Sequence, residues 1–86
     1  MKSVKIYTTQ WCSYCNAAKS FLDKLCVPYE EIDGTEDPGF RDKIEKITGR
    51  RSVPQIVIRG EAIGGYDDLQ ELHNQGKLLN KIEINS

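Results

Sequence analysis

The chain has 86 residues, carries a formal net charge of −1 at pH 7, and is 38% hydrophobic and 29% charged. This length accommodates one domain, residues 1–86, with no room for a second hydrophobic core. The balanced charge argues against a basic surface for nucleic acid or membrane. The sequence also has no long apolar segment that would predict a signal peptide or a membrane span. We therefore expect a cytoplasmic monomer that binds neither nucleic acid nor membrane.

The first half of the chain predicts a strand, a helix and a second strand. Alternating and β-branched residues favour a strand over 3–8, and apolar residues at helical spacing favour a helix over 14–26. Pro28 ends this helix because proline has no N–H donor and disfavours helical conformation at the residue before it. A short strand over 29–32 follows, parallel to the first strand if the helix makes the usual right-handed crossover.

The middle of the chain predicts a second helix between two turns. Asp37 and Pro38 have the residue types of a helix cap and a first helical position, and Thr48-Gly49 ends the apolar periodicity. The helix is followed by a polar turn that leads into the next strand.

The last third of the chain predicts a hairpin and a third helix. Strands over 55–58 and 62–63 are separated by a short turn, Gly64-Gly65 interrupts the sheet, and Asp67-Asp68 opens the helix. The predicted order is β-α-β-α-β-β-α. This order gives an α/β fold with a four-stranded mixed sheet flanked by three helices.

The segment Trp11-Cys12-Ser13-Tyr14-Cys15 joins the first predicted strand to the first predicted helix. Orphan N–H groups and the helix dipole favour negative charge at such a junction, and the thiolate is the reactive form of cysteine. Cys12 is therefore the candidate nucleophile. Cys15 lies about 4.5 Å further along the helix axis, which is compatible with a disulfide. Structural zinc needs four ligands, and one such pair with a distant His73 does not supply them, so redox chemistry is favoured.

Two further motifs have the composition of ligand-binding loops. Val53-Pro54 follows a polar turn and opens a strand, and from this pattern alone a cis and a trans peptide bond are equally expected. Gly64-Gly65-Tyr66-Asp67-Asp68 precedes a helix whose free N–H groups can bind a carboxylate. A plain helix-capping role for Asp67 is the alternative.

These three motifs, in this order on these elements, resemble the thioredoxin fold and in detail a dithiol glutaredoxin, over nearly the whole chain. The resemblance implies a cis bond at Val53-Pro54 and a glutathione site. In such a site the Val53 backbone pairs with glutathione, and Tyr66 and Asp67 hold its γ-glutamyl end. Tyr14 packs beside the glutathione sulfur. Arg41 best matches the family position that meets the glycyl carboxylate, with Arg50 and Arg51 as alternatives.

Three positions depart from the commonest glutaredoxin pattern. Ser13 stands where most dithiol members have proline, Thr9 where many have lysine, and Tyr66 where many have cysteine. The first departure is the one that raises the prospect of iron–sulfur binding.

The resemblance implies a glutathione-dependent thiol–disulfide oxidoreductase, with Cys12 as nucleophile and Cys15 as resolving cysteine. Glutathione is then the cosubstrate, the substrates are glutathionylated or disulfide-bonded proteins, and glutathione reductase acts indirectly. One alternative is a dimeric carrier of a glutathione-ligated [2Fe-2S] cluster, with Cys12 of each chain as a ligand. Another is a redoxin reduced by thioredoxin reductase, against which the Gly64-Gly65 loop argues.

Cys26 and His73 are expected to have structural roles. Cys26 lies roughly 16 Å along a continuous helix from Cys15, too far for a disulfide, and its spacing from Leu22 places it on the apolar face. We expect a core residue, with an exposed thiol that is glutathionylated or crosslinks two chains as the alternative. His73 is expected to be capping or solvated, and Trp11 to shield the site.

Overall fold

A computed structural model describes residues 3–82 of the chain. Its four-stranded sheet has the order β2-β1-β3-β4, with β1 (Val4–Thr8), β2 (Glu30–Asp33), β3 (Gln55–Ile58) and β4 (Glu61–Gly64). β1 pairs with β2 in parallel, whereas the β1–β3 and β3–β4 pairs are antiparallel. The predicted mixed sheet is confirmed.

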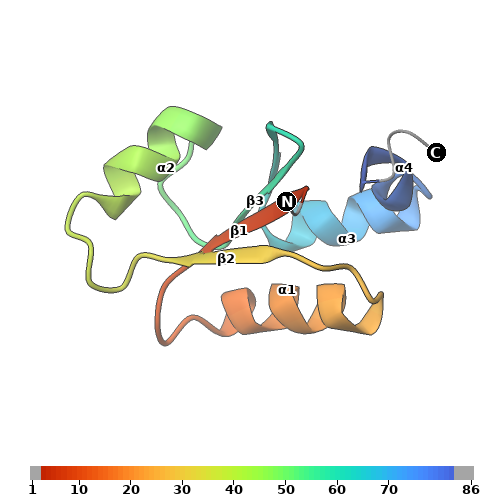
Figure 1. Cartoon of the computed structure of the whole chain (residues 1–86), viewed down its shortest axis with the longest axis horizontal. Coiled ribbons are helices and arrows are strands. Elements are labelled where there is room, and N and C mark those ends of the chain that lie inside the picture. The colour runs from red at the N-terminus through yellow and green to blue at the C-terminus, as the bar shows by residue number, and fades with distance from the viewer. Residues whose placement is uncertain (1–2, 83–86) are drawn as a thin grey trace.

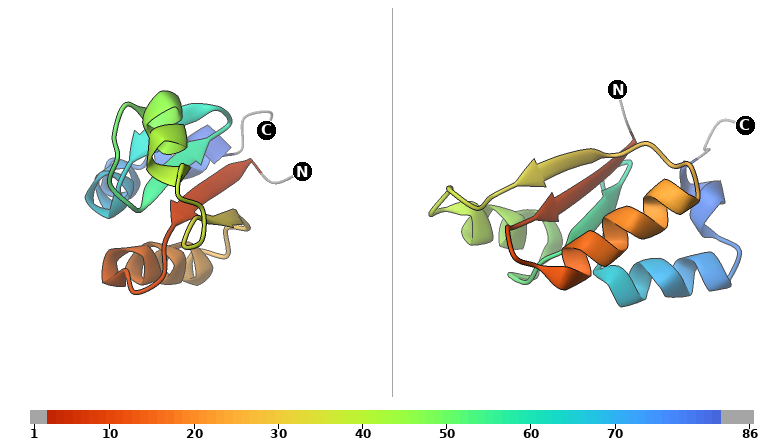
Figure 2. Two further views of the ribbon diagram at one scale, coloured as in Figure 1. Left: turned by 90° about the vertical axis from the view of Figure 1, so that its left-hand side faces the viewer. Right: turned by 90° about the horizontal axis from the view of Figure 1, so that it is seen from below.

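Helices cover both faces of this sheet. The three expected helices are α1 (Ser13–Lys24), α2 (Phe40–Thr48) and α3 (Tyr66–Asn74), and a short α4 (Leu78–Ile82) follows them. α1 and α3 run side by side on one face, and α2 lies alone on the other (Figures 1 and 2). The larger part of the core therefore forms between the sheet and the α1–α3 pair.

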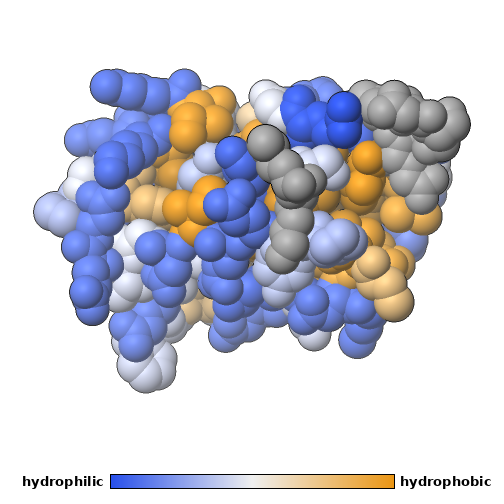
Figure 3. All heavy atoms as spheres, in the orientation of Figure 1, coloured by the Kyte–Doolittle hydropathy of each residue, from blue (hydrophilic) through white to orange (hydrophobic). Residues whose placement is uncertain are grey.

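The core follows from the alternation of residues in the strands. Val4, Ile6 and Thr8 of β1 are buried while their neighbours are partly exposed, because successive side chains of a strand point to opposite faces. The main cluster combines residues of β1, α1, the turn after α1, β3, α3 and α4, namely Val4, Ile6, Ala18, Leu22, Val27, Ile56, Ile58, Leu69 and Leu78. On the outside, polar residues separate the apolar patches of the face shown in Figure 3.

The prediction that Cys26 belongs to the core is wrong. α1 ends at Lys24, and Cys26 is exposed in the left-handed conformation, with φ of 58°. Cys26 N–H donates to Asp23 O, and Val27 N–H donates to Leu22 O, which is the Schellman pattern of a helix end. The turn carries Val27, not Cys26, into the core.

The second helix begins later than its cap residues predict. Its N-cap is Gly39, and Asp37 lies in the preceding turn, where Oδ1 accepts the Gly39 N–H at 3.0 Å. Smaller differences affect the strands: β2 spans Glu30–Asp33 and β4 spans Glu61–Gly64. Within residues 3–82, no helix combines the length and apolar character needed to cross a membrane.

Candidate active site

The candidate nucleophile, Cys12, lies at the end of the loop that connects β1 to α1. Cys12 is the N-cap of α1, with extended backbone angles, and its Sγ accepts the Cys15 N–H at 3.2 Å. A sulfur that accepts a backbone N–H at a helix N-terminus is in a position suited to negative charge. Cys12 is partly exposed, and the preceding Trp11 has φ of 63° and a side chain that is 92% exposed.

Cys15 occupies a contrasting environment one turn into the helix. It is buried, and this burial, reinforced by the Cys12 side chain, raises the pKa of Cys15 to about 12. A backbone hydrogen bond from Thr9 and the charge of Lys19 act in the opposite direction on this pKa. Cys15 therefore keeps its proton at neutral pH, and Cys12 is the thiol of the pair that a substrate can reach.

The loop before β3 borders Cys12. The Val53-Pro54 peptide bond is cis, as the resemblance implies, and the Cys12 Sγ lies 3.9 Å from Val53 O. The buried side chain of Gln55 holds this loop in place, because its Nε2 donates to Ser52 O at 3.0 Å and to Ser52 Oγ at 3.1 Å. The sequence analysis missed Gln55, although a polar residue at the start of an apolar strand was a usable signal.

A cavity of about 300 Å³ brings five of the predicted site residues together. These are Tyr14, Val53, Pro54, Tyr66 and Asp67. Tyr14 and Tyr66 face each other with ring centroids 6.3 Å apart, although Tyr14 remains largely exposed. The volume lies at the lower end of the range for small-molecule sites.

The capping role that the sequence left open for Asp67 belongs to other residues. Gly65 is the N-cap of α3, and Asp68 supplies the capping carboxylate, with Oδ2 accepting the Gly65 N–H at 3.0 Å. Gly64 has φ of 121°, and a Cβ there would collide with the Asp68 carboxylate. Asp67 is thus not used as the cap, and it lines the cavity.

Arg41 lines a neighbouring hollow and not this cavity. The hollow has a volume of about 410 Å³ and also contains Thr9, Trp11 and Arg51. Arg41 Nη1 donates to Arg51 O at 2.6 Å, and the Arg51 guanidinium pairs with Asp42 and Glu45. Binding of the glycyl carboxylate by Arg41 stays a prediction, and this contact would have to form at the second hollow.

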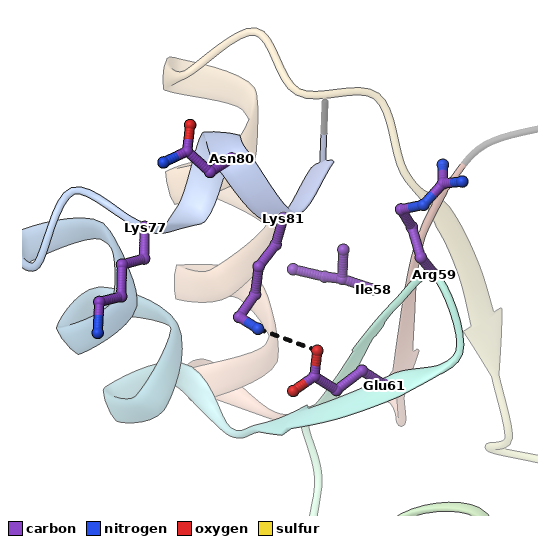
Figure 4. Close-up of a pocket in the computed structure, with 6 residues that line it drawn as sticks. All are labelled: Ile58, Arg59, Glu61, Lys77, Asn80 and Lys81. Carbon is purple, nitrogen blue, oxygen red and sulfur yellow. Dashed lines mark hydrogen bonds and ion pairs between the residues drawn. The ribbon is translucent and has the colours of Figure 1, made fainter. Parts of the chain in front are cut away.

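Another hollow, of about 440 Å³, lies between the β3–β4 turn and α4 (Figure 4). Lys81 Nζ meets Glu61 Oε1 at 2.9 Å across it, and the side chains of Lys77 and Arg59 point away from each other. It is lined by no cysteine, so we place the thiol chemistry at Cys12. In the part of the chain that the structure describes, no group of three or more His, Cys, Asp and Glu side chains could hold a metal ion.

Comparisons with known proteins agree with this arrangement. The glutaredoxin family model matches residues 4–63. A glutaredoxin of Pseudomonas aeruginosa is 42% identical over 78 residues, covering 91% of this chain and 93% of its own length. Glutaredoxin 3 of Escherichia coli K12 is 40% identical, covering 91% and 94%.

Solved structures show the same fold. A buckwheat glutaredoxin–glutathione complex has a TM-score of 0.86 and 29% identity, covering 93% of this chain and 76% of that one. The holo form of glutaredoxin C1 from Populus tremula x tremuloides has a TM-score of 0.87 and 28% identity, covering 96% and 78%. With its accessible cysteine at the start of α1 and its mixed sheet, this chain belongs to the glutaredoxin family of thiol–disulfide oxidoreductases.

Proposed function

We propose that the protein reduces protein–glutathione mixed disulfides and protein disulfides with glutathione as its cosubstrate. One observation carries the proposal: the Cys12 sulfur lies 3.9 Å from the carbonyl oxygen of Val53, and Val53 and Asp67 line one cavity. The buckwheat glutaredoxin, which has the same fold, is a complex with glutathione.

Glutathione binds in this proposal as an extended peptide along the loop before β3. The Val53 N–H and C=O pair with its backbone like an added strand, which places the glutathione sulfur near Cys12. Asp67 meets the α-ammonium, and the N–H groups of Tyr66 and Asp67 at the start of α3 face the γ-glutamyl end. Tyr14 and Pro54 flank the sulfur, and Arg41 meets the glycyl carboxylate.

In the monothiol route, only Cys12 reacts. Its thiolate attacks the glutathione sulfur of a protein–glutathione disulfide, the S–S bond breaks, and the protein thiolate leaves and takes a proton. A second glutathione thiolate then attacks the glutathione sulfur on Cys12. The products are oxidised glutathione and the regenerated Cys12 thiolate, so one free glutathione is consumed for each mixed disulfide reduced.

In the dithiol route, both cysteines react. Cys12 thiolate attacks a protein disulfide, and Cys15 then attacks the Cys12 sulfur while its proton passes to the departing substrate thiolate. The Cys12–Cys15 disulfide holds the two oxidising equivalents until glutathione reduces it. Because burial keeps Cys15 protonated, it does not compete with Cys12 for the first attack.

A coupled assay tests the proposal. The protein is supplied with a glutathione mixed disulfide, reduced glutathione, glutathione reductase and NADPH, and NADPH oxidation is followed. Fast turnover supports the glutathione-dependent reaction. Absence of turnover, together with activity when thioredoxin reductase replaces glutathione and its reductase, would instead identify a redoxin that thioredoxin reductase reduces.

We propose iron–sulfur cluster carriage as a second candidate, favoured by the exposed Ser13 that follows Cys12 at the start of α1. Cys12 would be the protein ligand from each of two chains, with two glutathione thiolates completing the set. A bound cluster would supply an iron–sulfur group for transfer. Anaerobic purification tests this candidate, and a colourless monomer without visible absorbance would contradict it.

A further inference from the structure

The structure separates the three arginines that surround the site. Arg41 and Arg51 line the hollow that contains Trp11, whereas Arg50 lines the cavity that contains Asp67. Among the described residues that line this cavity, Arg50 is the one cationic side chain, and it stands opposite two carboxylates. Arg50 is therefore placed to read a different part of a bound ligand from Arg41.

The backbone of Arg50 is held by the end of α2. Thr48 Oγ1 donates to Ile44 O at 2.8 Å and accepts the Arg50 N–H at 3.1 Å. Gly49 between them takes the left-handed conformation that ends the helix, with φ of 82°. These contacts consequently fix the position of the Arg50 backbone at the edge of the cavity.

The guanidinium of Arg50 is held by Asp68. Arg50 Nη1 lies 3.2 Å from Asp68 Oδ2, and the same oxygen accepts the Gly65 N–H at 3.0 Å. Asp68 is thereby anchored to the start of α3 while it orients Arg50. A guanidinium has five N–H donors, and this contact uses one of them, so the others remain available to a carboxylate.

We propose that Arg50 binds the α-carboxylate at the γ-glutamyl end of glutathione, and that Asp68 is the residue that positions it. This assignment rests on the proposed function and deepens it. Asp67 takes the α-ammonium and Arg50 the α-carboxylate, so the cavity selects a complete α-amino-acid head group and not simply a thiol. The N–H groups at the start of α3 add to the carboxylate contact.

The test measures the first chemical step in a Cys15→Ser background. The Cys12 thiolate attacks the symmetrical disulfide of a tripeptide, the S–S bond breaks, Cys12 gains one tripeptide, and one tripeptide thiolate leaves. Quenched-flow mass spectrometry follows the adduct. Three disulfides are compared: glutathione, 4-aminobutanoyl-cysteinylglycine, which lacks the α-carboxylate, and glutaryl-cysteinylglycine, which lacks the α-ammonium.

Arg50→Ala should lower the second-order rate constant with glutathione disulfide by about tenfold, the size expected for one charge-assisted contact at a partly exposed site. The same loss should persist with the glutaryl disulfide and vanish with the 4-aminobutanoyl disulfide. Arg50→Lys should recover part of the rate because it keeps the charge. Asp68→Asn, which retains an acceptor for Gly65 N–H, should show a smaller loss with the same dependence on the α-carboxylate.

Two controls keep the possible failures apart. Lys46→Ala removes a positive charge from an exposed position of α2 that lines neither hollow beside Cys12, and it should change none of the rates. If the wild-type protein reacts no faster with glutathione disulfide than with 2-hydroxyethyl disulfide, the proposed function fails. If that preference is present but Arg50→Ala affects all three tripeptides equally, or accelerates the reaction, the Arg50 assignment alone is wrong.

Discussion

Each end of helix α1 carries a cysteine that is at least partly exposed, and the two cysteines differ in what surrounds the sulfur. At the N-terminus, Cys12 Sγ accepts a backbone N–H and lies 3.9 Å from Val53 O. At the C-terminus, Cys26 is the more exposed residue, and its sulfur makes no hydrogen bond with any of residues 3–82. Exposure alone therefore does not make a cysteine reactive: a backbone N–H donor, the positive end of the helix dipole and a nearby cavity distinguish Cys12 from Cys26.

The largest expected effect on turnover comes from replacing the cysteine sulfur at the N-terminal end of α1. Cys12→Ser should reduce turnover of a glutathione mixed disulfide to the uncatalysed rate, because the attacking sulfur is lost. Cys26→Ser is the matched control at the other end and should retain full turnover. The coupled NADPH assay measures both, and a loss of activity in Cys26→Ser would contradict the assignment of the reaction to Cys12 alone.

The second prediction concerns the buried cysteine between these ends. Cys15→Ser should abolish reduction of protein disulfides while glutathione mixed disulfides are still turned over, since only the dithiol route uses a resolving thiol. Parallel assays with an insulin-type disulfide substrate and a small glutathione disulfide separate the two routes. Loss of both routes, with Cys12→Ser active, would reverse the assignment of the two cysteines.

A labelling experiment with pH as the variable sharpens the contrast between buried and exposed sulfur. Because burial raises the pKa of Cys15 to about 12, its reaction with iodoacetamide should be absent near neutral pH and increase as the pH approaches that value. Cys26 should be alkylated readily in the same samples. Mass spectrometry of the peptides measures both, and rapid labelling of Cys15 in the native protein at pH 8 would contradict its burial.

The smallest effect is expected on stability, at the C-terminal end of α1. Cys26 adopts φ of 58° at the position where Gly76, with φ of 73°, ends α3 in the same Schellman pattern. Left-handed conformation costs a residue with a Cβ about 1–2 kcal/mol, part of which the greater entropy of unfolded glycine offsets. Cys26→Gly should therefore stabilise the protein by about 0.5–1 kcal/mol in urea unfolding.

The mirror substitution supplies the control for that prediction. Gly76→Ala should destabilise the protein by about 1 kcal/mol, since it introduces a Cβ at an equivalent helix end. If Cys26→Gly lowers the free energy of unfolding, the strain argument at Cys26 is wrong.

The sequence predicted the parts of the molecule that depend on local pattern. Strand alternation, helical periodicity and the breaks at Pro28 and Gly64-Gly65 were sufficient for the order of elements and the mixed sheet. The Cys12–Cys15 pair was also found from its place between a strand and a helix. The resemblance to glutaredoxins, and not local pattern, singled out Val53 and Tyr66, which line one cavity.

The parts that the sequence did not predict depend on where a side chain points after distant elements have packed. Nothing local distinguished Arg50 from Arg41, and only the packing of the α2–β3 loop against α3 places Arg50 beside Asp68. Cys26 was misplaced because its spacing continues the apolar periodicity of α1, whereas the Schellman turn makes Val27 the buried residue.

Trp11 gives the molecule an optical property. It is the one tryptophan in the sequence, its indole is 92% exposed, and it adjoins the sulfur that changes partner during the reaction. In the proposed cycle Cys12 passes through a thiolate, a glutathione adduct and a Cys12–Cys15 disulfide, and each of these would present a different quencher and a different local charge to one chromophore. We therefore expect the fluorescence of the unlabelled protein to change at each step of the proposed cycle.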